Sequence, residues 1–76
     1  MLLYRIYAER LYNEDVGNYL SYGISLYEII GHEYVLLDEI SDVSLDYMKM
    51  RSLEQKMNAG QASYLHFCEI VEDFIG

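Results

Sequence analysis

The stretch Tyr19 to Ile30, YLSYGISLYEII, decides the fold of this chain. Apolar side chains occupy every second position from Leu20 to Leu26, and serine or glycine stands between them. A period of two residues is typical of a β-strand with two different faces. We predict that this stretch is the middle strand of a small antiparallel sheet, flanked by strands at Met1 to Tyr12 and Glu33 to Ser41.

The connections between these strands carry the expected turn residues. Asn13 to Asn18, NEDVGN, collects turn formers, and glycine and asparagine take the positive φ angles that hairpin loops need. Gly31 and His32 form a shorter break before the third strand, whose β-branched and aromatic residues precede another polar cluster. The first half of the chain therefore predicts a three-stranded meander.

After Asp42 the apolar period changes to three and four residues. This spacing, which predicts an amphipathic helix, is followed by Val43, Tyr47, Met50, Leu53 or Glu54, and Met57. Asp42 or Ser44 is expected to cap its first turn, because a short side-chain oxygen accepts a hydrogen bond from a free N–H there.

The first helix is expected to stop at the sequence Asn58-Ala59-Gly60. A second helix is predicted from Ser63 to about Ile75, with a broad apolar stripe. The stripe comprises Tyr64, Phe67, Cys68, Val71, Phe74 and Ile75. The predicted fold is α+β, a three-stranded antiparallel meander followed by two helices packed on one face (βββαα), in a single domain of residues 1–76.

The charge distribution limits the partners that the chain can bind. The formal net charge is -8, from 13 acidic residues against 5 Lys and Arg, and Leu11 to Met48 contains no Lys or Arg. Direct binding to nucleic acid is disfavoured, because it requires a basic surface that displaces counterions from phosphates. A partner protein with a basic surface suits this chain better.

The composition also favours a cytoplasmic protein. A single cysteine, Cys68, cannot form an internal disulfide, and the first residues show no secretory signal. No apolar run approaches the roughly 18 residues that cross a bilayer, so no membrane association is expected.

Residues that could carry catalysis are few and badly spaced. Cys68 and His66 stand two apart, which on a helix points them in nearly opposite directions. Cys68 is therefore interpreted as a small buried residue and His66 as a surface residue. No spacing that binds a metal or a nucleotide is present. We expect no enzyme activity, no catalytic residue, no metal site and no cofactor.

The tyrosines indicate a binding surface. If Tyr4 and Tyr22 face the helices, Tyr7, Tyr19 and Tyr27 lie on the other face of the sheet. This face is expected to stay uncovered, and tyrosine is enriched at protein interfaces, although it also has high β propensity and tolerates a half-wet surface. The candidate protein-binding residues are these three tyrosines and the acidic residues Glu14, Asp15, Glu28, Asp38, Glu39 and Asp42. The edges of strands one and three, which contain no proline, offer a second route to a partner.

Two short motifs resemble a family of small uncharacterised proteins of clostridial-type bacteria. They are EISDVS at Glu39 to Ser44 and IVEDFI at Ile70 to Ile75, together with Tyr22-Gly23-Ile24 in the middle strand. One departure is the missing proline at the start of the last helix, which that family often has. The resemblance implies a bacterial cytosolic setting and the βββαα fold, and it implies no activity or cofactor.

Three hypotheses for function follow. The first is a non-enzymatic, acidic protein-binding module, in its sharpest form an inhibitor that blocks the basic nucleic-acid-binding surface of a partner, as anti-CRISPR and anti-restriction mimics do. The second is a homodimeric bacterial accessory or regulatory protein. The third, a small enzyme or metal protein that uses Cys68, His32 or His66, ranks last.

Overall fold

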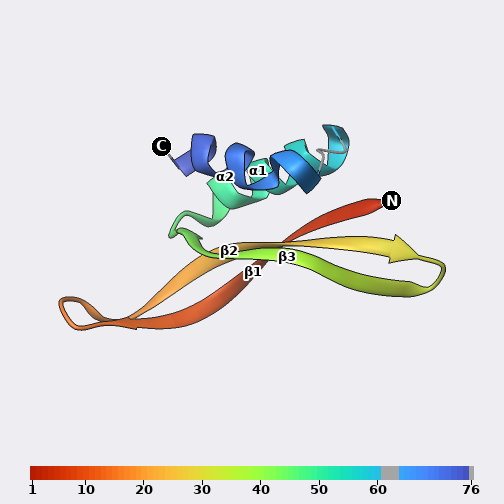
Figure 1. Ribbon diagram of the computed structural model, residues 1–76. Coiled ribbons are helices and arrows are strands. Elements are labelled where there is room, and N and C mark those ends of the chain that lie inside the picture. The colour runs from red at the N-terminus through yellow and green to blue at the C-terminus, as the bar shows by residue number, and fades with distance from the viewer. Residues whose placement is uncertain (61–63, 76) are drawn as a thin grey trace.

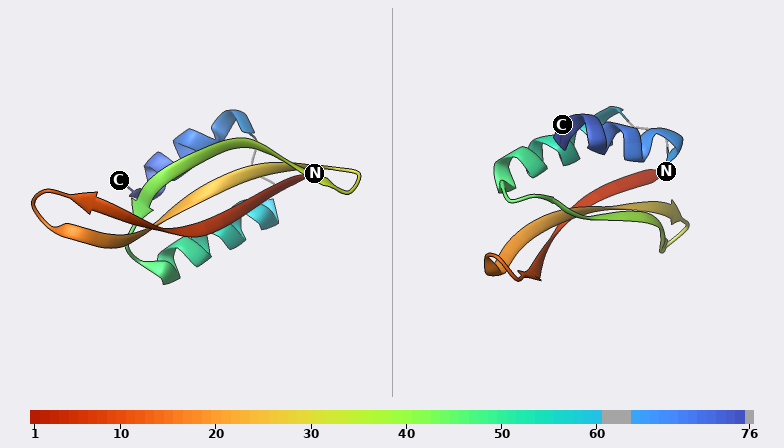
Figure 2. Two further views of the ribbon diagram at one scale, coloured as in Figure 1. Left: turned by 90° about the horizontal axis from the view of Figure 1, so that it is seen from below. Right: turned by 60° about the vertical axis from the view of Figure 1, so that its left-hand side comes forward.

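The protein folds as a three-stranded sheet followed by two helices, as predicted. The computed structural model describes residues 1–60 and 64–75, and the elements are shown in Figure 1. In chain order they are β1 (Leu2–Asn13), β2 (Gly17–Ile30), β3 (Glu33–Ser44), α1 (Tyr47–Gly60), a 3₁₀ turn η1 (Tyr64–His66) and α2 (Phe67–Ile75). The helices lie together on one side of the sheet, which is seen most clearly in the right-hand view of Figure 2.

The sheet is an antiparallel meander in the order β1-β2-β3. Each strand extends beyond its predicted range by one to three residues, and both hairpin ends project past the helices (Figure 1). The backbone φ angle is 79° at Gly17 and 62° at Gly31, where a side chain would be strained. These two glycines set the turns that join the strands.

The end of β3 and the start of α1 differ from the prediction. The pairing between β2 and β3 shifts register near Tyr22, so that β3 continues to Ser44 and buries Val43 in the core. Asp42 and Ser44 therefore belong to the strand and do not cap the helix. The cap is Asp46, whose Oδ1 accepts a hydrogen bond from the backbone N of Lys49 at 3.1 Å.

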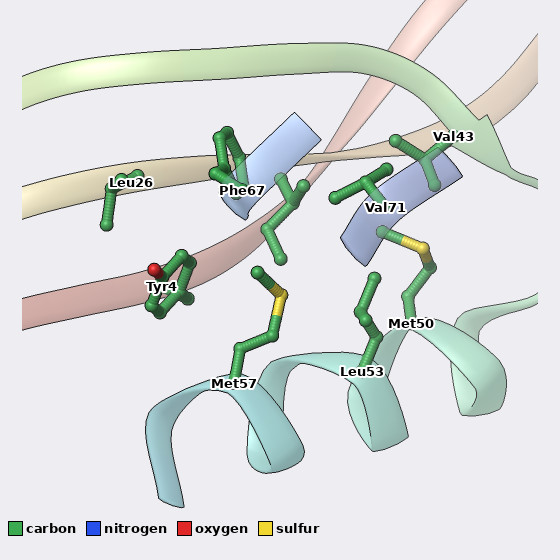
Figure 3. Close-up of a cluster of buried hydrophobic side chains, with 9 residues drawn as sticks. Tyr4, Leu26, Val43, Met50, Leu53, Met57, Phe67 and Val71 are labelled. Atoms are coloured by element: carbon green, nitrogen blue, oxygen red, sulfur yellow. The ribbon is translucent and has the colours of Figure 1, made fainter. Parts of the chain in front are cut away.

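The core lies between the sheet and the two helices, and Figure 3 shows its close-packed side chains. The rings of Tyr4 and Phe67 lie 5.6 Å apart and join β1 to α2. Burying apolar area of this kind is the main force that holds a domain this small together. The buried apolar residues are Tyr4, Ile24, Leu26, Val43, Met50, Leu53, Met57, Phe67 and Val71.

The second helix matches its prediction in part. Phe67 and Val71 are buried and Phe74 packs against the core, whereas Cys68 is exposed. The interpretation of Cys68 as a buried residue is wrong, because the buried stripe of α2 is narrower than predicted and contains only Phe67 and Val71. The predicted start at Ser63 lies outside the described residues.

The outer edge of β1 is closed by α1 over part of its length. Asn58 accepts a hydrogen bond from the backbone N of Tyr4 at 2.8 Å through Oδ1 and donates one to the backbone O of Tyr4 at 2.9 Å through Nδ2. Glu54 Oε2 accepts a hydrogen bond from the backbone N of Ile6 at 2.8 Å. These side chains replace a neighbouring strand, so the prediction that both sheet edges are open is wrong for this part of β1.

Candidate protein-binding face

The sheet face opposite the helices is not covered by α1 or α2 (Figure 2). Residues that pair across the strands share a face, so the alternation of β1 and β2 fixes which side chains lie here. We call this surface the open face. It comprises Leu3, Arg5, Tyr7, Glu9, Leu11, Tyr19, Ser21, Gly23, Ser25, Tyr27, Leu36, Glu39, Ser41 and Asp42.

Two carboxylates on the open face are held by hydrogen bonds. Asp42 accepts from the hydroxyl of Ser21 at 2.7 Å through Oδ1 and from the hydroxyl of Tyr19 at 3.0 Å through Oδ2. Glu9 Oε2 accepts from the hydroxyl of Ser41 at 2.7 Å and from the backbone N of Asp42 at 2.8 Å. The two carboxylates, one on β1 and one on β3, are thus connected to each other and to hydroxyl groups of β2.

The irregular backbone of β3 makes this network possible. Asp42 has a φ of 54°, a left-handed conformation that aspartate adopts more readily than most residues. The conformation occurs where β3 shifts register against β2, and there the backbone N of Asp42 donates to Glu9. Register shifts of this kind re-aim side chains, so the same feature that carries β3 onward to Ser44 also places the carboxylate of Asp42 over Ser21.

Tyr7 lies over Gly23 in the middle of the open face. A Cβ added at Gly23 would stand 2.5 Å from Cζ and from the hydroxyl oxygen of Tyr7, so the ring occupies the space above the glycine. Burial raises the pKa of the Tyr7 hydroxyl, and the carboxylates of Glu9 and Glu39 raise it further, against a smaller opposing effect of a hydrogen bond with Ser41. The tyrosine is therefore neutral and fixed at physiological pH.

Beside Tyr7 the open face is slightly hollowed. A shallow hollow of ≈ 300 Å³ is bordered by Arg5, Tyr7, Ser25, Tyr27 and Glu39, with Ile6 at its margin. The hydroxyl of Ser25, which is buried, donates to Glu39 Oε2 at 3.4 Å, a long and weak hydrogen bond. Most of the capacity of this carboxylate to bind a cation is therefore unused.

The predicted binding residues fall into two groups. Tyr7, Tyr19, Tyr27, Glu39 and Asp42 lie together on the open face. Tyr19 also has a raised pKa, first because its hydroxyl donates to Asp42.

The other four predicted acidic residues lie elsewhere. Glu14 and Asp15 are exposed at the tip of the β1–β2 hairpin, and Glu28 pairs with Leu2, a residue of the helix-covered face. Asp38 is half-buried on β3, and its Oδ1 accepts from the backbone N of Glu39 at 2.7 Å. The acidic stretch of the sequence does not therefore form a single surface.

Glu9 is a candidate binding residue that the sequence reasoning did not name. It follows Tyr7 by two positions, so the strand alternation alone places it on the same face as this tyrosine. Glu9 precedes the acidic stretch from Leu11 to Met48, and only the pairing of neighbouring strands brings it beside Asp42.

The residues considered for catalysis lie in three different elements. His32 is exposed in the β2–β3 loop, and Cys68 is exposed on α2. His66, in η1, has its Nδ1 3.5 Å from Glu69 Oε2, and both side chains are largely exposed. Across residues 1–60 and 64–75, no group of three or more His, Cys, Asp or Glu side chains could hold a metal ion. Within the same ranges no helix is long and apolar enough to cross a membrane.

The comparison with protein families matches residues 1–76 to DUF6514, described as a family of unknown function. The chain belongs to this family. A resemblance to a small uncharacterised family was expected from the motifs, and the match over the whole chain of this DUF6514 protein confirms that part of the expectation. No curated protein and no solved structure matches the chain.

Proposed function

We propose that this DUF6514 protein is a non-enzymatic binding module whose open face docks on a basic surface of a partner protein. The observation that carries the proposal is the hydrogen-bonded pair of carboxylates, Glu9 and Asp42, on a sheet face that neither α1 nor α2 covers. Tyr7, Tyr19 and Tyr27 surround the acidic groups with aromatic area, which is enriched at binding hot spots.

Preorganisation is the physical reason that these acidic groups suit binding. A flexible surface carboxylate loses side-chain entropy when it pairs with a cation, and this loss cancels much of the Coulomb energy. Asp42 and Glu9 are already held by Ser21, Tyr19 and Ser41, so little more is lost. Each carboxylate still has lone pairs for an incoming Lys or Arg.

The charge of the open face also favours a basic partner over a second open face. Glu9, Glu39 and Asp42 outnumber the one cation, Arg5, so two open faces brought together would repel each other. The net charge of -8 adds to this repulsion and steers a positively charged partner toward the surface.

The finer form of the proposal is an inhibitor that occupies a nucleic-acid-binding surface of its partner. In this form the carboxylates occupy the positions of phosphates, so the inhibitor and nucleic acid compete for one surface of the partner.

We also propose a cytoplasmic setting in a clostridial-type bacterium. The sequence resemblance and the free thiol of Cys68, which suits a reducing compartment, support this setting.

The test compares two double variants with the same change in charge. Asp42→Asn with Glu39→Gln removes two charges from the open face, and Glu72→Gln with Asp73→Asn removes two from exposed positions of α2. Each variant and the wild-type protein are immobilised and exposed to lysate of a clostridial-type bacterium at low salt, with and without added duplex DNA or RNA.

The proposal predicts that the immobilised wild-type protein retains a basic protein from the lysate, and that added nucleic acid or added salt releases this basic protein. Its affinity should fall by about tenfold in the open-face variant, because two exposed ion pairs of up to about 1 kcal/mol each contribute at most about 2 kcal/mol. The α2 variant should bind like the wild type. Equal losses in the two variants would show that only total charge matters. Retention that is insensitive to salt and nucleic acid would refute the mimicry.

A further inference from the structure

The two edges of the sheet are protected to different extents. On β1, α1 supplies Asn58 and Glu54 to the backbone of Tyr4 and Ile6, and the strand beyond them carries the charged residue Arg10. On β3, the stretch Glu33 to Leu36, EYVL, has no proline and only one charged residue, and the register shift against β2 comes after it, at Leu37. Soluble proteins usually protect an edge of this kind by one of those means.

The backbone of this stretch points hydrogen-bonding groups outward. Ile30 and Glu33 close a two-residue loop, and such a pair exchanges hydrogen bonds across the hairpin. Since bonded and non-bonded pairs alternate, the N–H and C=O groups of Tyr34 and Leu36 point away from β2. No residue in the described part of the chain is shown to receive them.

The side chains along this edge are also available. Tyr34 is 64% exposed, Leu36 is 51% exposed and Val35 is 39% exposed. Apolar side chains in a strand usually pack against a helix or a second sheet, so these exposed fractions are high for apolar residues. The regular ladder ends at the register shift at Leu37, and the backbone N of Glu39 beyond it is already bonded to Asp38. The open edge is therefore a three-residue apolar segment, Tyr34 to Leu36, between the hairpin loop and this register shift.

We propose that this edge pairs antiparallel with the same edge of a second copy, about a two-fold axis at Val35. Tyr34 then lies opposite Leu36 of the other copy, and these residues exchange four backbone hydrogen bonds. Val35 lies opposite Val35 of the other copy in the closer, non-hydrogen-bonded arrangement. The product is a continuous six-stranded sheet, and it uses the edge of the sheet and not the open face.

The charges along the edge fit this register. Within the paired segment, Tyr34 to Leu36, no residue is charged, so no like charges stand directly across from each other. Glu28, which pairs with Val35, lies one strand further in. In the proposed dimer, Glu28 of one copy is about three strand spacings, or about 14 Å, from Glu28 of the other copy. This distance is beyond the Debye length at physiological salt.

A second copy suits this edge because an isologous contact must be complementary to itself. The pairing of Tyr34 with Leu36 and of Val35 with itself meets this condition with apolar side chains throughout. A strand from another protein would need no two-fold axis. The crosslinking and sedimentation experiments below distinguish pairing with a second copy from pairing with another protein.

The first experiment is disulfide crosslinking in a Cys68→Ser background. Val35→Cys places two thiols in directly opposed positions, with Cα atoms about 4.5 Å apart, which is within the range of a disulfide. Glu33→Cys is the matched control, because the two copies of residue 33 are offset by four residues, or about 13 Å. Mild oxidation should crosslink the Val35→Cys variant rapidly and the control slowly. Equal rates would overturn the register.

The second experiment measures the mass of the wild-type protein and of Val35→Lys by sedimentation. The wild type should form a dimer, and Val35→Lys should raise its Kd by about tenfold or more, because two ammonium groups then face each other and apolar contact is lost. Circular dichroism checks that the variant is folded. A wild-type protein that remains monomeric at about 1 mM overturns the proposal, as does a Val35→Lys variant that dimerises equally well.

Discussion

The side chain of Asn58 makes the most specific long-range contact in the fold. It is separated from Tyr4 by 54 residues and bonds both backbone groups of that residue, at 2.8 Å and 2.9 Å. Replacing Asn58 by alanine removes both bonds at once. Because Tyr4 is fully buried at the junction of β1 with the helices, its backbone groups then lose partners that water replaces only in part.

The expected loss of stability is large for a domain of this size. An unsatisfied buried backbone group costs about 1–3 kcal/mol, and two such groups cost about 2–6 kcal/mol. The groove beside β1, of ≈ 410 Å³, admits some water, and alanine is a better helix former than asparagine by about 0.6 kcal/mol. We therefore expect a loss of about 2–4 kcal/mol, against a total stability of about 4–11 kcal/mol for 76 residues.

Urea unfolding followed by circular dichroism measures this loss. With a slope of about 1 kcal/mol/M for a small domain, Asn58→Ala should lower the midpoint by about 2 M or more. Gln55→Ala is the control, because Gln55 is exposed on the same helix and should change the stability by less than about 0.5 kcal/mol. If Asn58→Ala and Gln55→Ala unfold at the same urea concentration, the edge contact contributes nothing and the reasoning is refuted.

Three further predictions concern the sheet, the helix cap and pH. Gly23→Ala should destabilise the protein by about 1–3 kcal/mol, because the new Cβ would stand 2.5 Å from the ring of Tyr7 and 2.7 Å from the backbone O of Ile40. Asp46→Ala should cost about 1 kcal/mol in the same urea assay, since the first turn of α1 loses its cap. Burial raises the pKa of Tyr7 and of Tyr4 in the folded protein, so the unfolded chain releases these protons at a lower pH than the folded protein does. The free energy of unfolding should therefore fall as the pH rises above 10. Tyr7→Phe should reduce this alkaline loss.

Each of these predictions has a matched control. Gly60→Ala should be neutral or slightly stabilising, because nothing lies within 4 Å of its added Cβ and a helix favours alanine. Ser52→Ala, at an exposed position of α1, should leave the cap and the stability nearly unchanged. Tyr12→Phe should leave the alkaline loss unaltered, since Tyr12 is 70% exposed. If Gly23→Ala is as stable as the wild type, Tyr7 does not lie over the glycine as described.

The strand order and the core could be predicted from the sequence because both depend on local periodicity. The alternation in β2 identified the face that contains Ile24 and Leu26. The spacing in α1 identified Met50 and Met57, and it left open the choice between Leu53, which is buried, and Glu54. Burial of one face is a property of each segment separately, so no knowledge of distant contacts was needed.

The junction between β3 and α1 was mispredicted because its conformation depends on another strand. Val43 fits a helical spacing, but its burial comes from a register shift against β2 that extends β3 to Ser44. The left-handed conformation of Asp42 is supported by contacts with Ser21, Tyr19 and Glu9. None of these contacts is visible in a local pattern.

The closed edge of β1 was missed for the same reason. Asn58 was interpreted as part of a helix stop signal, and Glu54 was named only as an alternative to Leu53 in the helical spacing. Their roles depend on contacts 54 and 48 residues away along the chain. The candidate site was predicted in part: the tyrosines followed from alternation, whereas the acidic cluster needed the pairing of three strands.

Hydroxyl-radical footprinting of the tyrosines, with and without a captured basic partner, tests the central claim most directly. Tyr7, Tyr19 and Tyr27 lie on the open face, and Tyr47 and Tyr64, which are 45% and 44% exposed, lie on the helical part of the molecule. We predict that the partner protects the three open-face tyrosines from oxidation and leaves Tyr47 and Tyr64 as reactive as in the free protein. Protection of Tyr47 and Tyr64, with unchanged oxidation of the other three, would contradict the assignment of the open face as the binding surface.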